Sequence, residues 1–367
     1  MDNPLAHFSP TYAAARRHWL ALAAARGLAV ESHTHPLTGP EGEALAIDVV
    51  REGPADASRV LLTTSAVHGV EGHVGAGIQA GLLAMGAPGS PGAGMRGPDD
   101  ADTAIVHVHA VNPHGFAWGR RVTHENVDLN RNFVDFGQPL PQHPDYAAIH
   151  ADLLPATWPP PAESEARLQA TLAGMGPRRA QMAITKGQHT HPDGMYFGGG
   201  APTWSHQAFR AILRRHAGRC RALAWIDLHS GLGPFGVGER IFAAFDTGAA
   251  LQRARRWWGE GITSVDAGTS TSIPLTGPIQ AAVAWDAPQA DYTGICLEFG
   301  TVPLDRMLMA LRADHWLHQH PEADAALAAG IRRQVREAFY PDTDAWKRQV
   351  WAQGLEAAQQ ALAGLRG

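Results

Sequence analysis

Cysteine is scarce in this chain of 367 residues, which has only Cys220 and Cys296. Two widely separated cysteines, each inside an apolar run, form neither a disulfide framework nor a CxxC metal site, so we interpret both as small buried hydrophobic residues. Long apolar runs are missing too, since no uncharged stretch approaches the roughly 20 residues that span a bilayer. Basic clusters are also absent, and 30 Lys and Arg against 35 Asp and Glu give a net charge of −5. These absences argue against a membrane protein and against a nucleic-acid partner.

The N-terminal sequence MDNPLAHFSP lacks the basic-then-apolar pattern of a secretory signal. Together with the low cysteine content, this predicts a soluble protein of the reducing cytoplasm. The chain is 45% hydrophobic, enough for one large domain or two smaller ones. No internal repeat and no shift in composition marks a boundary, so we predict one domain over residues 1–367. We expect a proline-rich insertion at 137–161 and a helical region from 303 onward. The sequence carries no signal for an oligomeric state.

Apolar runs of strand length alternate with helical patterns along most of the chain. The run at 60–67 is nearly all apolar and rich in β-branched residues, as expected for a parallel strand buried on both faces. Strands alternating with helices predict an α/β fold: a mixed, mostly parallel, twisted sheet flanked by helices on both faces. The further predicted strands are 45–51, 104–111, 222–228, 240–245 and 294–299.

Polar residues follow or end three of these predicted strands. His68 and Glu71 come directly after one strand, His229 ends another, and Glu298 lies in a third. Ligand sites of open α/β sheets gather at the carboxyl edge of the strands. A His-x-x-Glu turn that curls like a helix brings its imidazole and carboxylate within reach of one ion. With His229 as a third ligand the set matches catalytic zinc, which uses three protein ligands and keeps a position for water. On its own, His-x-x-Glu occurs often by chance and is more commonly a surface ion pair.

Five longer motifs follow one another along the chain: HGVEG at 68–72, VNPHGFAWGRR at 111–121, NVDLNRNF at 126–133, WIDLHSG at 225–231 and CLEFGT at 296–301. In these motifs and in their order the chain resembles the zinc carboxypeptidase superfamily, and within it a bacterial branch. This superfamily includes carboxypeptidase A-like peptidases and the aspartoacylase and succinylglutamate desuccinylase deacylases. The resemblance covers roughly residues 60 to 300.

The resemblance implies a role for each residue of the predicted metal centre. It implies that His68, Glu71 and His229 hold one Zn²⁺ per chain, and that Glu298 is the general base that activates water. It also implies that Asp128 accepts a hydrogen bond from the far nitrogen of the His68 ring. Such a contact fixes the tautomer of the ring and raises its basicity.

The resemblance also implies how a substrate is held. Asn130 and Arg131 match the pair that grips a terminal carboxylate, and a guanidinium does this with two parallel hydrogen bonds. Arg121 matches the arginine that stabilises the oxyanion of the tetrahedral intermediate. Arg120 is the alternative, because the spacing of the motif does not distinguish between two adjacent arginines. We therefore predict a hydrolase that cleaves an amide bond beside a free carboxylate, in a small molecule or a short peptide.

Several alternatives stay open from the sequence. The first is an N-acyl amino acid deacylase, since such a substrate needs the same carboxylate grip. The second is a zinc-binding module without activity, and the third a dinucleotide-binding oxidoreductase, although the glycines after strand 60–67 do not read G-x-G-x-x-G. Carboxypeptidase A-like peptidases carry a mobile tyrosine on a loop before the catalytic glutamate, but residues 268–285 contain none. Tyr196 and Tyr292 are candidates to hydrogen-bond the substrate instead.

Overall fold

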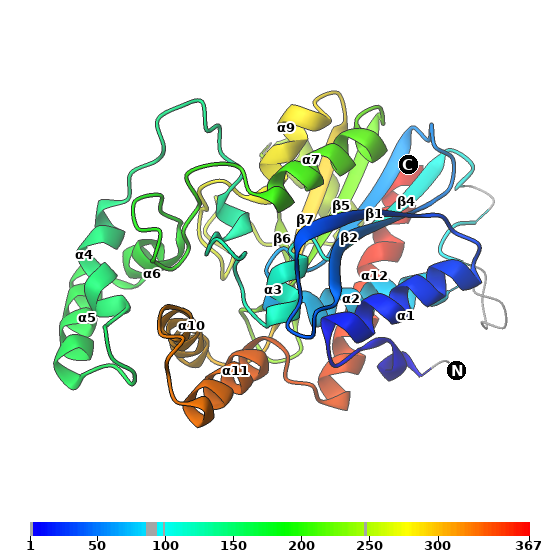
Figure 1. Ribbon diagram of the computed structural model, residues 1–367. Helices are drawn as coiled ribbons and strands as arrows, with labels where there is room; N and C mark the ends of the chain where they lie inside the picture. Colours follow the sequence, from blue (N-terminus) through cyan, green and yellow to red (C-terminus); the bar gives the residue numbers. More distant parts are fainter. Residues whose placement is uncertain (1–2, 86–93, 98–99, 246–247) are drawn as a thin grey trace.

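A single mixed sheet lies at the centre of the computed structural model, which describes residues 3–85, 94–97, 100–245 and 248–367. In this part of the chain the sheet has seven strands in the order β1-β2-β4-β3-β5-β7-β6 (Figure 1). The strands are β1 Val30–Thr38, β2 Ala44–Glu52, β3 Arg59–Thr64, β4 Thr103–His109, β5 Ala222–Gly231, β6 Gly238–Phe242 and β7 Asp291–Gly300.

Most strands of the sheet run in one direction. The four central strands β4, β3, β5 and β7 are parallel, whereas β2 and β6 are antiparallel to their central neighbours. Strand β1 is antiparallel to β2 and therefore runs with the central group. The predicted mixed, mostly parallel sheet is thus confirmed. Strand β1 was not predicted, because its sequence VESHTHPLT is polar and contains a proline. Such a strand is typical of a sheet edge.

Helices cover both faces of the sheet, as predicted (Figure 1). Alternate strand residues face opposite sides, so Leu61 and Ile105 share a core with α2 and α12, while Leu62 and Val106 share one with α7. Several helices begin behind a threonine whose hydroxyl accepts a backbone N–H. These threonines are Thr11, Thr203 and Thr343. The helices against the sheet are α1 Tyr12–Ala25, α2 Gly72–Ala84, α7 Trp204–Ala217, α8 Ala249–Trp258, α9 Ala282–Asp286 and α12 Asp344–Arg366.

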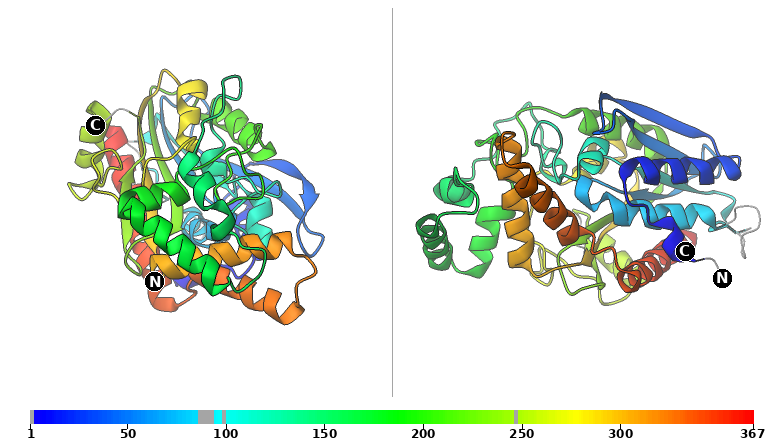
Figure 2. Two further views of the ribbon diagram at one scale, coloured as in Figure 1. Left: turned by 90° about the vertical axis from the view of Figure 1, so that its left-hand side faces the viewer. Right: turned by 60° about the horizontal axis from the view of Figure 1, so that its bottom comes forward.

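A second group of helices packs together beyond the sheet, in a separate hydrophobic cluster (Figures 1 and 2). We call it the helical group: α4 Pro144–Leu153, α5 Ala162–Met175, α6 Pro177–Thr185, α10 Leu304–Gln319 and α11 Ala325–Phe339. The stretch at 137–161 is therefore not wholly irregular. Helix α4 begins within it at Pro144, since proline is accepted in the first turn of a helix.

The remaining elements are short. They are η1 Pro4–His7, η2 Gly69–Glu71, α3 Pro113–Trp118, η4 Leu129–Arg131 and η5 Ile279–Ala281. Among the residues that the structure describes, no helix combines the length and the apolar character that crossing a membrane requires.

Candidate active site

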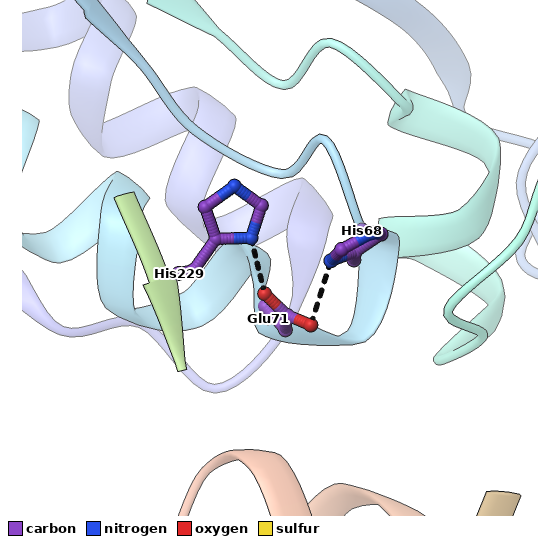
Figure 3. A group of neighbouring side chains, drawn as sticks. All are labelled: His68, Glu71 and His229. Atoms are coloured by element: carbon purple, nitrogen blue, oxygen red, sulfur yellow. Dashed lines mark hydrogen bonds and ion pairs between the residues drawn. The ribbon is translucent and has the colours of Figure 1, made fainter. Parts of the chain in front are cut away.

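The three predicted metal ligands meet at the carboxyl edge of the central strands. Glu71 lies between two imidazole rings, with its Oε1 2.9 Å from His68 Nδ1 and its Oε2 2.8 Å from His229 Nδ1 (Figure 3). One donor atom from each of the three residues lies within 4.8 Å of the others, and all three residues are buried. The structure thus brings together residues that are far apart in the sequence, in a set that fits one metal ion.

The turn that carries His68 and Glu71 is fixed by close packing of backbone on backbone. A Cβ atom on Gly69 would lie 2.0 Å from the carbonyl carbon of Gly115, so only glycine fits there. The N–H groups of Gly69 and Val70 donate to the carbonyl oxygens of Arg121 and Arg120, at 3.0 and 2.8 Å. The HGVEG and NPHGFAWGRR motifs are therefore packing partners, which explains why both are needed to build this site.

A buried carboxylate supports each of the two imidazole rings from behind. Asp128 Oδ1 lies 3.2 Å from His68 Nε2, and Asp227 Oδ2 lies 2.9 Å from His229 Nε2. When each Nε2–H donates to its aspartate, both Nδ1 atoms present a lone pair toward Glu71. This carboxylate–histidine arrangement orients metal-ligating imidazoles in proteins. The resemblance implied such a contact for Asp128. For Asp227, which shares a strand face with His229, the sequence left a contact to a metal-ligating ring and a structural hydrogen bond equally open.

The site holds more negative charge than positive charge. When all of its carboxylates are ionised, four negative charges stand against two positive charges, an excess of two that a divalent cation would balance. The carboxylates are those of Glu71, Asp128, Asp227 and Glu298, and the guanidiniums are those of Arg121 and Arg131. The donor set and its charge therefore both fit a divalent ion.

Glu298 lies on β7 directly beside His229 of the neighbouring strand β5. Its Oε1 accepts a hydrogen bond of 3.0 Å from the backbone N–H of Leu232. Burial, together with the negative charge of Glu71, raises the pKa of Glu298 to about 8. Without a cation, a proton on Glu298 thus removes one of the two excess negative charges. Despite burial, the negative charge of Asp227 helps to raise the pKa of His229 well above its usual value, so the His229 ring takes up a proton as well. A carboxylate with a raised pKa is suited to proton transfer near neutral pH.

Arg121 reaches into the same site. Its Nη1 donates to Glu71 Oε1 at 3.1 Å and its Nε to Asp128 Oδ2 at 3.0 Å. Its Nη2 also lies 2.8 Å from His68 Nε2. That ring nitrogen can donate to Asp128 or accept from Arg121, but not both, because it carries either a proton or a lone pair. The Arg121 guanidinium lines the pocket that opens from the site.

Arg120, its neighbour, points elsewhere. Its Nε donates to Asp314 Oδ2 on α10 at 3.1 Å, and the residue does not line this pocket. Spacing in the sequence left the two arginines open as alternatives. The structure places Arg121 at the site and Arg120 against the helical group.

Asn130 and Arg131 both line the pocket. Arg131 directs three of its five N–H groups at backbone carbonyl oxygens: Nε and Nη2 at that of Thr185, and Nη1 at that of Asn130. Two N–H groups are left, one on each terminal nitrogen, and this pair can meet a carboxylate. The side-chain oxygen of Asn130 accepts from the Ile279 N–H at 2.9 Å. Its amide nitrogen is thus the group left for a substrate.

Tyr196 lies between the two arginines of the site. Its ring centroid is 5.3 Å from the guanidinium carbon of Arg121 and 5.4 Å from that of Arg131. The residue has a φ of 53°, which is unusual for a bulky side chain and often marks a functional position. Tyr292, the other candidate from the sequence, donates to the carbonyl oxygen of Ala243 and lies outside this pocket.

The pocket has a volume of about 370 Å³ and a largely apolar wall. Sequence reasoning did not identify this wall, because apolar residues in loops and helix ends carry no motif. Part of it comes from the segment 268–285, for which no specific residue was named. Apolar residues of the wall include Phe242, Ile273, Pro274, Leu275, Leu304 and Met307.

Two further residues near the metal ligands were not assigned a role from the sequence. Gln280 donates to Asp227 Oδ2 at 3.1 Å and so fixes the carboxylate behind His229. Cys296 lines the pocket and forms a second group of donor atoms with His229 and Glu298. Burial raises the pKa of the Cys296 thiol to about 12, so the thiol is neutral at physiological pH.

Fold and site together define an α/β protein with a candidate metal centre at the carboxyl edge of a mixed sheet. The model of the family described as "Protein of unknown function (DUF2817)" matches residues 8–353, and the chain belongs to this family. A comparison with curated proteins found no match.

The chain is similar to several solved structures. Carboxypeptidase A from Helicoverpa armigera is 13% identical, with a TM-score of 0.44 over 90% of this chain and 74% of the other. A metallo-carboxypeptidase from Burkholderia cenocepacia is 12% identical, with a TM-score of 0.43 over 84% and 68%. Bovine thrombin-activatable fibrinolysis inhibitor is 11% identical, with a TM-score of 0.43 over 91% and 98%. These are likenesses of fold.

Proposed function

We propose that this protein is a zinc-dependent hydrolase that cleaves an amide bond next to a free carboxylate. One observation carries the proposal: Glu71 lies between the Nδ1 atoms of His68 and His229, and each ring is supported from behind by a buried aspartate. Two neutral imidazoles and one carboxylate form a ligand set of catalytic zinc. In this proposal the three residues hold one Zn²⁺ per chain.

Bound zinc supplies a Lewis acid that polarises a carbonyl group and makes nearby water more acidic. Glu298 lies beside His229 and takes the proton of the attacking water, which it then delivers to the leaving nitrogen. Arg121 lines the pocket and offers its guanidinium to the oxyanion that develops on the carbonyl oxygen. One such preorganised donor contributes roughly 3 kcal/mol to the stability of a transition state.

Substrate recognition in this proposal rests on a charged end and an apolar wall. The two remaining N–H groups of Arg131 and the amide of Asn130 bind the free carboxylate, while the ring of Tyr196 holds the Arg131 guanidinium in place. The apolar wall of the pocket then accepts the adjoining side chain. We propose a small molecule or a short peptide as the substrate, in the cytoplasm.

N-acyl amino acids can bind to the same carboxylate-binding residues as peptides, because both end in a carboxylate. The absence of a tyrosine from 268–285, which forms part of the pocket wall, favours testing them as a second substrate class.

The test is to purify the chain, measure its metal by elemental analysis and assay the zinc-loaded protein against dipeptides and N-acyl amino acids side by side. We expect about one zinc in the site formed by His68, Glu71 and His229, and turnover of at least one class. A Glu71→Gln variant is expected to lose this ion and the activity. A protein that neither contains zinc nor takes it up, or a Glu71→Gln variant with normal turnover, would contradict the proposal.

A further inference from the structure

We propose that His150, His191 and Asp193 form a second binding site for a divalent transition-metal ion, away from the candidate active site. One donor atom from each residue lies within 4.8 Å of the others. His150 belongs to α4, and the other two belong to the loop that follows α6. None of the three lines the pocket described above.

The spacing within this cluster fits ligands that share one ion. His150 Nε2 and Asp193 Oδ2 are 3.4 Å apart, at the long end of the hydrogen-bonding range. Two ligands on a tetrahedral ion, each at about 2.1 Å from it, are separated by about 3.4 Å. The rings of His150 and His191 are stacked with centroids 4.1 Å apart.

The backbone that carries the two loop ligands is held in place before any ion binds. The sequence His191-Pro192-Asp193-Gly194 forms a tight turn, in which the Gly194 N–H donates to the His191 carbonyl oxygen at 2.9 Å. The buried side chain of Gln188 binds both the N–H and the carbonyl oxygen of His191, each at 2.8 Å. A preorganised site loses less conformational entropy when it binds a ligand.

His150 is supported as a metal-ligating histidine would be. Its Nδ1 lies 3.4 Å from the hydroxyl oxygen of the buried Tyr146, which leaves Nε2 facing Asp193. Burial lowers the pKa of His150, so that its ring is neutral at pH 7 and has a lone pair to offer. Asp193 is well exposed, which leaves room for water to complete the coordination. Two imidazoles and one carboxylate suit Zn²⁺, and also Co²⁺ or Ni²⁺ as probes.

The proposed ion would tie the helical group to the loop that reaches the active-site pocket. Tyr146, which supports His150, also accepts a hydrogen bond of 2.7 Å at its hydroxyl oxygen from the Met195 N–H. The next residue, Tyr196, lines the pocket. Binding at the second site would therefore restrain the loop that carries Tyr196.

Calorimetric titration of the metal-free full chain with Zn²⁺ tests this site without any assay of activity. We expect two ions per chain for the wild type and one ion for His191→Ala and for Asp193→Asn. The control is His33→Ala, which removes a histidine that also lies beside an acid but is not part of the cluster, and it should still bind two. A wild-type chain that binds no more ions than His191→Ala and Asp193→Asn do would overturn the proposal.

The two metal sites can be distinguished because each has its own variant. Glu71→Gln should lose the active-site ion and keep the second one, while Asp193→Asn should do the reverse. Hydrogen exchange supplies an independent readout: the second equivalent of Zn²⁺ should slow exchange in 187–198 by several-fold in the wild type but not in His191→Ala. Binding of the second ion with no change in exchange would overturn the proposed restraint of the loop.

Discussion

The two proposed metal sites of this chain are built in opposite ways. The centre of His68, Glu71 and His229 is buried, and each of its rings is supported by a carboxylate that is itself fully buried. The cluster of His150, His191 and Asp193 is partly exposed, and a tyrosine hydroxyl supports its one helical histidine. Both sites consist of two histidines and one carboxylate. The difference teaches that the burial of the ligands and the charge around them, more than the ligand types, decide which site we propose for catalysis and which for restraining a loop.

Glu298→Gln gives the largest expected effect and tests the buried centre. The amide is almost the same size but cannot accept a proton, so kcat should fall by about 10² to 10⁴. The ion content should stay at the wild-type value, because Glu298 is not among the three proposed ligands. Elemental analysis and steady-state kinetics on one preparation check both parts. Near-normal turnover would remove Glu298 from its role, and lost metal would make it a ligand.

The sequence could predict the buried centre because its parts are strand ends and tight turns. An apolar run followed by His68 and Glu71 shows where the strand ends, and Gly69 in the motif reflects a contact that excludes any side chain. The parallel centre of the sheet and its covering helices follow from the same alternation of patterns. The residues that these motifs imply for the metal centre do lie together, although their catalytic roles stay predictions.

Helices α10 and α11 of the helical group lie in the helical region expected from 303 onward, but how the group packs could not be predicted in this way. His150 and His191 meet only because α4 and the loop after α6 pack on a common hydrophobic cluster, and nothing in their spacing shows it. The same holds for the pocket wall and for the choice between Arg120 and Arg121. Two adjacent arginines fit the same sequence motif equally well. Only tertiary packing directs Arg121 to the pocket and Arg120 to Asp314 on α10.

Arg121→Lys, compared with Arg120→Lys, tests whether that separation matters for function. Lysine keeps the charge but loses the planar pair of donors, so Arg121→Lys should lower kcat/KM by about 10²-fold. Arg120→Lys is the matched control, because it makes the same change at a side chain outside the pocket and should alter kcat/KM less than threefold. An equal loss of kcat/KM in both variants would show that the two arginines affect activity by stabilising the fold, and not by a direct role of Arg121 in the pocket.

Arg131→Lys tests the proposed carboxylate grip and should have a smaller effect. We expect KM for substrates with a free carboxylate to rise by about tenfold, since one charge-assisted hydrogen bond is lost. The corresponding substrates with an amidated end should show little change. Kinetics on such pairs of substrates provide the measurement. Equal changes for both members of a pair would contradict a grip on the carboxylate.

The last expected effect is on stability instead of activity: it concerns a proton, and it compares the two regions again. In the metal-free protein Glu298 has a pKa of about 8, well above the ordinary value near 4.5, so the folded state holds a proton that the unfolded state releases. This proton stabilises the fold fully below pH 4.5, and the stabilisation is lost as the pH rises toward 8. Between these values the contribution of Glu298 to the free energy of unfolding should decrease by up to about 1.4 kcal/mol per pH unit. Urea denaturation of metal-free protein between pH 5.5 and 7.5 should show this component in the wild type and in Asp193→Asn, but not in Glu298→Gln. The same slope in all three proteins would mean that the excess negative charge of the buried centre is relieved elsewhere.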